Sequence, residues 1–202
     1  MKETVAIIGA AGDMGAAIAL GLAQTGYRVL LADEIERHAL LYVKLHLLAC
    51  KIRFEAPQAD VEVVTSGREA SWEADIIVLA IPGEAEAGMA SRIKDVVTGK
   101  VVISLACLVN GTHDRLISVP AHSVAEELTR LLPHSKIVAP FSAIFPAHPG
   151  TPGAAGMSAN VFLAGDDKEA VFTVMRLAKD AGYNPLVEGK SNPTLMSNIR
   201  HL

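Results

Sequence analysis

The chain has 202 residues, of which 50% are hydrophobic and only 4% aromatic, and its net charge is −4. This balance gives no reason to expect nucleic acid or an anionic membrane surface as a partner. The first apolar run is too short for a signal peptide and no uncharged stretch reaches membrane-spanning length, so we expect a cytoplasmic protein with no membrane contact.

The first predicted unit is a strand, a glycine turn and a helix. Residues 4–8 are apolar and largely β-branched, which predicts a buried strand. Gly9, Gly12 and Gly15 follow at once, and the alanine-rich residues 16–23 predict a helix. Glycines permit close approach of a backbone, and a helix N-terminus attracts anions. The unit is therefore typical of a loop that holds the pyrophosphate of a dinucleotide.

A second buried strand is predicted at residues 27–32, with Asp33 at its end. Asp33 follows Gly12 by about 20 residues, the spacing at which a carboxylate accepts hydrogen bonds from a ribose diol. Ala10 stands where the first glycine of G-x-G-x-x-G belongs, with Gly9 just before it, so we expect Gly9 to shape the turn. The alternative is a glycine turn in an α/β protein that binds nothing.

The dinucleotide is expected to contact the glycine turn and the end of the second strand. The predicted residues are Gly9, Ala10, Ala11, Gly12, Asp13, Met14, Gly15, Asp33 and Glu34. Asp33 and Glu34 favour NAD over NADP, because the 2′-phosphate of NADP would bring further negative charge against them.

Residues 34–55 contain neither Pro nor Gly and predict one long helix. Its apolar residues lie on more faces than one sheet surface covers, so we expect a homodimer or larger homo-oligomer that buries part of this helix or of the C-terminal third. Cys50 and Cys107 lie in apolar runs, which predicts buried, reduced thiols. Their number and spacing suit neither a disulfide framework nor a metal site, and we expect no metal.

Strands and helices alternate through the rest of the chain. Strands are expected at 61–65, 76–81, 101–105, 136–139, 160–164 and 184–187, and helices at 84–97, at 121–132 and from the capping pair Asp166 and Asp167 to 181. Alternation of this kind predicts an α/β fold, a doubly wound and mostly parallel sheet of the Rossmann, NAD(P)-binding type with a small C-terminal extension. We expect one NAD(P)-binding domain over residues 1–202.

In open α/β sheets, ligands bind outside the carboxyl ends of the strands. Ala80, Ile81 and Pro82 end the fourth strand, so we expect the nicotinamide or its ribose to pass there. The ends of the fifth and sixth strands are expected to line a slot for the second substrate. Its candidate residues are Ala106, Asn110, Ser142 and Pro146, each with a purely structural role in a turn as the alternative.

Catalytic residues are not evident from the sequence. Hydride transfer between two bound molecules depends mainly on positioning, so a dedicated acid–base pair is not required. His148, in a Gly/Pro-rich loop beside the expected slot, is a weak candidate for acid–base catalysis.

Five stretches, spread over nearly the whole chain, carry a family resemblance. They are the glycine turn at 9–15, Leu79-Ala-Ile-Pro-Gly-Glu84, Ser123-Val-Ala-Glu-Glu-Leu128, Pro146-Ala147 and Gly165-Asp-Asp-Lys168. Together they resemble the NADP oxidoreductases that use the coenzyme 8-hydroxy-5-deazaflavin. The resemblance implies hydride transfer between NADP and a deazaflavin.

Three positions depart from the family pattern. Asp33-Glu34 replaces a Ser-Arg pair that in the family grips the 2′-phosphate, and Gly83 replaces a bulky aromatic residue. A family histidine is replaced near Ser142. The first change argues against NADP, and the other two argue against the deazaflavin.

The sequence therefore predicts an NAD(P)-dependent oxidoreductase, with NAD favoured. Its second substrate is expected to be a deazaflavin, a flavin or a small carbonyl or imine compound. The alternatives are an imine or carbonyl reductase, a non-catalytic NAD(P)-binding sensor or regulatory protein, and a remnant whose site needs a partner subunit.

Overall fold

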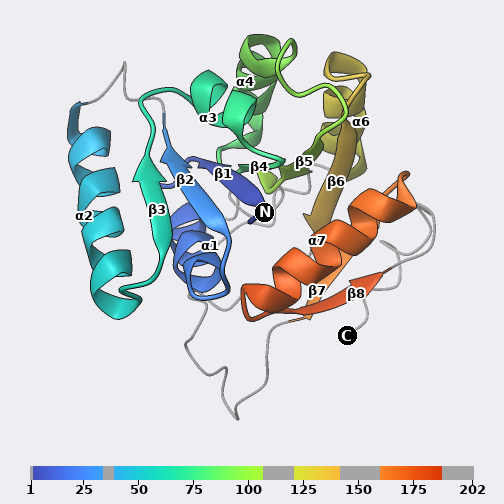
Figure 1. Cartoon of the computed structure of the whole chain (residues 1–202). Coiled ribbons are helices and arrows are strands. Elements are labelled where there is room, and N and C mark those ends of the chain that lie inside the picture. Colours follow the sequence, from blue (N-terminus) through green and yellow to red (C-terminus); the bar gives the residue numbers. More distant parts are fainter. Residues whose placement is uncertain (1, 34–38, 107–120, 142–159, 188–202) are drawn as a thin grey trace, which may run out of the picture.

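The computed structural model describes residues 2–33, 39–106, 121–141 and 160–187. In these residues one sheet has the strand order β3-β2-β1-β4-β5-β6-β7-β8 (Figure 1). The strands are β1 (Thr4–Ile8), β2 (Arg28–Ala32), β3 (Asp60–Val63), β4 (Ile76–Leu79), β5 (Val101–Ser104), β6 (Lys136–Phe141), β7 (Asn160–Gly165) and β8 (Asn184–Val187). Strands β1 to β6 are parallel, β7 is antiparallel to β6, and β8 is parallel to β7. The predicted α/β class with a mostly parallel sheet is confirmed.

Helices cover both faces of the sheet. They are α1 (Asp13–Ala23), α2 (Ala39–Glu55), α3 (Gly67–Glu73), α4 (Gly83–Ile93), α6 (Ala121–Leu131) and α7 (Lys168–Asp180). Residues of α1, α2 and α7 join one buried cluster, and residues of α3, α4 and α6 join the other. Val5 and Ile7 of β1 face the first cluster, whereas Ala6 and Ile8 face the second, because side chains alternate along a strand. Both faces are covered, which explains the uninterrupted apolar runs of the strands.

Helix α3 was not predicted. It begins after Ser66, whose Oγ accepts a hydrogen bond from the N–H of Glu69 at 3.1 Å. Ser-x-x-Glu is the spacing of a capping box, and this signal could have identified the helix from the sequence.

The expectation of a buried Cys50 is wrong, because its thiol is exposed. Leu45, Ala49 and Ile52 form the face of α2 that packs on the sheet, and Cys50 does not belong to that face. Cys107 lies outside the described residues.

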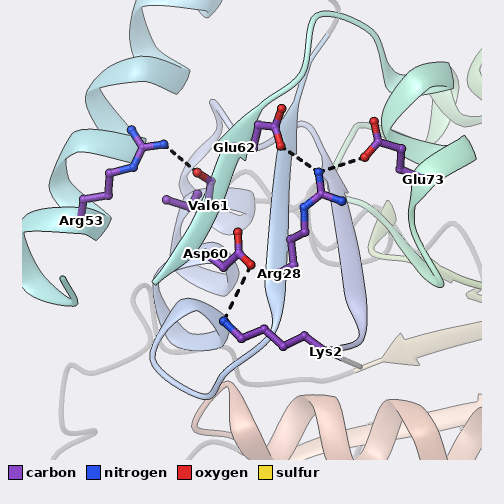
Figure 2. Close-up of polar contacts among 7 residues, drawn as sticks. All are labelled: Lys2, Arg28, Arg53, Asp60, Val61, Glu62 and Glu73. Atoms are coloured by element: carbon purple, nitrogen blue, oxygen red, sulfur yellow. Dashed lines mark hydrogen bonds and ion pairs between the residues drawn. The ribbon is translucent and has the colours of Figure 1, made fainter. Parts of the chain in front are cut away.

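Ion pairs tie the amino ends of β2 and β3 to their neighbours (Figure 2). The guanidinium of Arg28 lies 2.8 Å from Glu62 and 3.0 Å from Glu73. Partly exposed pairs of this kind contribute little to stability. Their importance here is positional, because Arg28 begins β2 and is paired there, whereas Asp33 directly follows the other end of the strand.

Candidate functional site

Four chain segments start from neighbouring points at the carboxyl edge of the sheet. Ile8 pairs with both Ala32 and Leu79, and Leu79 pairs with Ser104. These residues end β1, β2, β4 and β5. From β1 the chain adds β2 and β3 on one side of β1, and it then crosses over to add β4 on the other side. Open α/β sheets bind ligands at such a switch point.

The glycine turn after β1 is closely packed. Gly9 has a φ of +91°, in the left-handed region that favours glycine, as the sequence led us to expect. The N–H groups of Gly9 and Ala10 donate to the carbonyl oxygen of Ala32 at 2.9 and 3.1 Å. A Cβ atom on Gly9 would lie 2.3 Å from the carbonyl oxygen of Ala80, and one on Gly15 would lie 2.4 Å from that of Gly9. Both glycines are therefore required for packing, whatever the turn binds.

Gly12 differs from these two glycines. It is the exposed N-cap of α1, with φ −85° and ψ 161°, and a Cβ atom there would come no closer than 3.4 Å to the carbonyl oxygen of Gly9. The N–H groups of the first turn of a helix have no acceptor within that helix. Together with the helix dipole, they form a site for an anion. The backbone around Gly12 is therefore suited to a pyrophosphate.

Asp33, which directly follows β2, contacts the glycine turn. Its Oδ2 accepts a hydrogen bond from the N–H of Ala11 at 3.2 Å, and the residue is half-buried. A carboxylate has about four lone-pair sites, so it can accept ribose hydroxyls in addition to this bond. The structure therefore brings Asp33 to the glycine turn. Glu34 lies outside the described residues.

The ends of β4 and β5 border the same edge. Ala80 and Ile81 are buried, whereas Pro82 is exposed. Ala106 is fully buried two residues after β5 ends. The other predicted slot and catalytic residues, Asn110, Ser142, Pro146 and His148, lie outside the described residues.

Glu86, which was not predicted from the sequence as a site residue, carries a buried carboxyl group beside the last residue of β5. Glu86 of α4 is 2% exposed, and its two carboxyl oxygens lie 2.7 and 3.0 Å from Oγ of Ser104. The pKa of Glu86 is raised to about 7, chiefly because of burial and to a smaller extent because of the like charge of Glu127. Hydrogen bonds from Ser104 and the Ala106 N–H oppose the rise.

The helical spacing of Glu86 with the apolar residues of α4 could have identified it from the sequence as an inward-facing residue. Glu86 precedes the buried residues Met89, Ala90 and Ile93 at helical intervals, which places it on the inward face.

We expect Glu86→Gln to stabilise the fold at about pH 8 and to change little at about pH 4. The pKa is raised from 4.5 in the unfolded reference to about 7 in the fold, so the native state binds more protons between these values. Stability is therefore lost as the pH rises through this window, by on the order of 3 kcal/mol. Urea unfolding at both pH values measures the effect, and Glu84→Gln, at an exposed position of the same helix, is the control. An equal effect of Glu86→Gln at both pH values would contradict the assignment.

The described residues give no support for a metal site, a membrane-spanning helix or a separate pocket for the second substrate. No group of three His, Cys, Asp or Glu side chains among them is placed to hold a metal ion. No helix among those described has the length and apolar character needed to cross a membrane. An apolar hollow between β5, β7 and α7 is lined by Ile103, Leu105 and Tyr183 among others, but by none of Ala80–Pro82, so we do not assign it as the second-substrate slot.

Comparisons with known proteins identify relatives of this chain. Residues 4–107 match the family model described as NADP oxidoreductase coenzyme F420-dependent. The F420-dependent NADP reductase of Methanocaldococcus jannaschii is 27% identical over 184 residues, which cover 86% of this chain and 78% of the relative.

Solved structures share the fold. A putative F420-dependent NADP reductase from Arthrobacter sp. FB24 superimposes with a TM-score of 0.73 at 22% identity, over 96% of this chain and 88% of that one. An imine reductase from Bacillus cereus superimposes with a TM-score of 0.68 at 18% identity, over 98% of this chain and 59% of that one. At such identities the likeness concerns the fold alone.

Proposed function

The chain belongs to the family of coenzyme F420-dependent NADP oxidoreductases, which are NAD(P)-dependent enzymes, and we propose that it transfers a hydride between a nicotinamide dinucleotide and a deazaflavin. The observation that carries this proposal is the open N-terminus of α1 at the switch point, with Asp33 on one side and the ends of β4 and β5 on the other. When bound, the reduced nicotinamide supplies the hydride, and the deazaflavin takes it up with one proton from water.

Each part of the chain has a role in this proposal. The first-turn N–H groups of α1 bind the pyrophosphate, and Asp33 accepts the ribose hydroxyls. Pro82, the exposed residue after β4, borders the nicotinamide, and the buried peptide at Ala106 supports the second-substrate side of the site from within. The protein thus contributes positioning and exclusion of water, which are the main demands of a hydride transfer. We also propose that residues 1–202 form one NAD(P)-binding domain.

NAD is proposed as the preferred dinucleotide, although the relatives named above are NADP reductases. The support is the carboxylate of Asp33 at the glycine turn and the engagement of Arg28 at the other end of β2.

A spectrophotometric assay tests the reaction. Oxidation of NADH and of NADPH is followed with coenzyme F420, flavin mononucleotide and the cyclic imine 1-pyrroline as acceptors. We expect turnover with F420. Turnover with only the imine would instead assign an imine reductase. Dinucleotide binding without turnover of any acceptor would favour a sensor or regulatory protein.

A homodimer through the outer face of α2 is also proposed. Leu40, Val43, Leu47 and Phe54 lie three, four and seven residues apart along α2 and are 65%, 51%, 64% and 88% exposed. This row lies opposite the face of α2 that packs on the sheet. Exposed apolar rows of this kind mark protein interfaces.

We expect Leu47→Glu to convert a dimer into a monomer, as measured by sedimentation at tens of micromolar, a concentration suited to a roughly micromolar association. Phe172→Glu, at an exposed apolar site of α7, tests the C-terminal third instead, and Trp72→Glu on α3 is the control. A monomeric parent protein at this concentration would refute the proposal.

A further inference from the structure

One buried carboxyl group joins the start of α4 to the end of β5. Glu86 is the fourth residue of α4, a helix that begins directly after the exposed Pro82, and Ser104 is the last residue of β5. The Oγ of Ser104 lies 2.7 and 3.0 Å from the carboxyl oxygens of Glu86. The N–H of Ala106 donates to the same Oγ at 3.4 Å and is close enough to the carboxyl group to lower its pKa. The peptide that leaves β5 is therefore held by a side chain of the helix that follows β4.

This contact requires an explanation, because a buried carboxyl group is costly. Ionising it in an apolar interior is unfavourable unless hydrogen bonds compensate. An apolar side chain would pack at this position of α4 without that cost. What a carboxyl group adds is the ability to accept a hydrogen bond from the Ser104 hydroxyl, which itself accepts one from the Ala106 N–H, and to interact favourably with that nearby N–H.

We propose that Glu86, acting through Ser104 and the Ala106 N–H, is a positioning residue that holds the end of β5 at the second-substrate side of the site. Its ionisation thereby tunes hydride transfer. The inference rests on the proposed function, because it requires a second substrate at this edge. An ionised carboxylate holds the Ser104 hydroxyl and the nearby Ala106 N–H strongly, since hydrogen bonds to charged acceptors are about twice as strong as neutral ones. The protonated group holds the peptide less firmly.

The charged groups near Glu86 determine how its contact with Ser104 and Ala106 responds to pH. Among the described residues, Glu127 of α6 is the charged side chain that acts on Glu86, and it raises the pKa of Glu86. Other charged groups on the helices packed against α4 have partners of their own: Arg68 pairs with Asp95, Glu69 with Thr65, Glu73 with Arg28, and Arg130 lies near Glu127. On α4 itself, Arg92 donates to the carbonyl oxygen of Gly88. Strands β4 and β5 carry no charged residue.

The first experiment measures the contact without relying on activity. We expect the amide signal of Ala106 in a ¹H–¹⁵N NMR spectrum of the whole chain to shift with a midpoint near pH 7. Glu86→Gln removes this titration. Ser104→Ala moves the midpoint up by roughly half a pH unit or more, because a donor to the carboxylate is lost. Glu127→Gln moves it down, because a like charge is lost. Glu84→Gln, on the exposed side of the same helix, leaves it unchanged.

The second experiment measures the consequence for the reaction. With F420 as acceptor, we expect kcat to rise with pH through about 7 in the parent protein. In Glu86→Gln the profile should be flatter and kcat roughly tenfold lower, as a displaced site costs rate rather than affinity. The KM for the dinucleotide should not change. Comparison between variants at each pH removes any titration that belongs to the substrates.

The outcomes separate the two proposals. An Ala106 amide that does not titrate, or that titrates equally in Glu86→Gln, overturns the positioning role. A titrating amide with parallel pH–rate profiles in the two proteins overturns it as well. If no acceptor is reduced, the proposed function fails, whereas the amide titration still decides whether Glu86 holds this peptide.

Discussion

Gly12→Val will leave the fold intact and weaken dinucleotide binding by at least roughly a hundredfold, ~2.7 kcal/mol. The backbone at Gly12 has φ −85° and ψ 161°, an extended conformation that valine adopts without strain. The nearest atom to an added Cβ is 3.4 Å away, so the native structure has room for it. The branched methyl groups would instead occupy the space in front of the α1 N-terminus, where the proposed pyrophosphate lies. A small loss of stability, about 1 kcal/mol, is expected because valine is a poor N-cap.

Calorimetric titration with NADH measures the loss, and circular dichroism with thermal unfolding reports the fold. Gly12→Ala is the graded variant and should bind with intermediate affinity. Gly88→Val is the matched control, because Gly88 has no atom within 4 Å of its Cβ position and lies on α4 away from the turn. Gly15→Val should destabilise the fold itself, because its Cβ would clash at 2.4 Å. Unchanged NADH affinity in a folded Gly12→Val protein would remove the glycine turn as the pyrophosphate site.

The second large effect concerns the choice of dinucleotide. We expect NADH to bind at least about tenfold more tightly than NADPH, because a 2′-phosphate would face the carboxylate of Asp33, and close like charges cost several kcal/mol. The Ala11 N–H already orients this carboxylate at the turn. Arg28 cannot offset the charge from β2, since it is paired with Glu62 and Glu73 at the opposite end of the strand.

Dissociation constants for NADH and NADPH, measured by fluorescence at one ionic strength, decide this question. The double variant Asp33→Ser/Glu34→Arg should shift the preference toward NADPH. Arg37→Ala is the necessary control, because Arg37 follows Asp33 closely in the sequence and is the cation that could bind a 2′-phosphate. Equal or tighter NADPH binding by the parent protein would show that Asp33 does not face the adenosine ribose.

The first 33 residues of the chain were predictable because their signals are local. A buried parallel strand needs an apolar run, a tight turn needs glycine, and a helix needs its own period, so β1, the glycine turn and α1 follow from neighbouring residues. Gly9 and Asp33 were identified for the same reason, since both belong to a motif of fixed spacing. The dinucleotide site remains a prediction, but the structure brings its described residues to one edge of the sheet.

Local sequence patterns did not identify three features of the structure. Short helix α3 was missed although Ser66 and Glu69 carry a capping signal, because a seven-residue helix has too little periodicity to stand out. The exposure of Cys50 depends on which face of α2 meets the sheet, and both faces are apolar. The antiparallel entry of β7 depends on pairing with β6, which no run of residues encodes by itself.

The sequence by itself determined the fold class, the glycine turn and the acid at the end of β2, because each depends on residue types at short, fixed intervals. Only the tertiary structure decided that Glu86 meets Ser104 and Ala106. That contact exists because β4 and β5 are neighbours in register and α4, which connects them along the chain, packs on one face of the same sheet. The raised pKa of Glu86 likewise arises from burial, which is a property of the packed interior and of no local pattern.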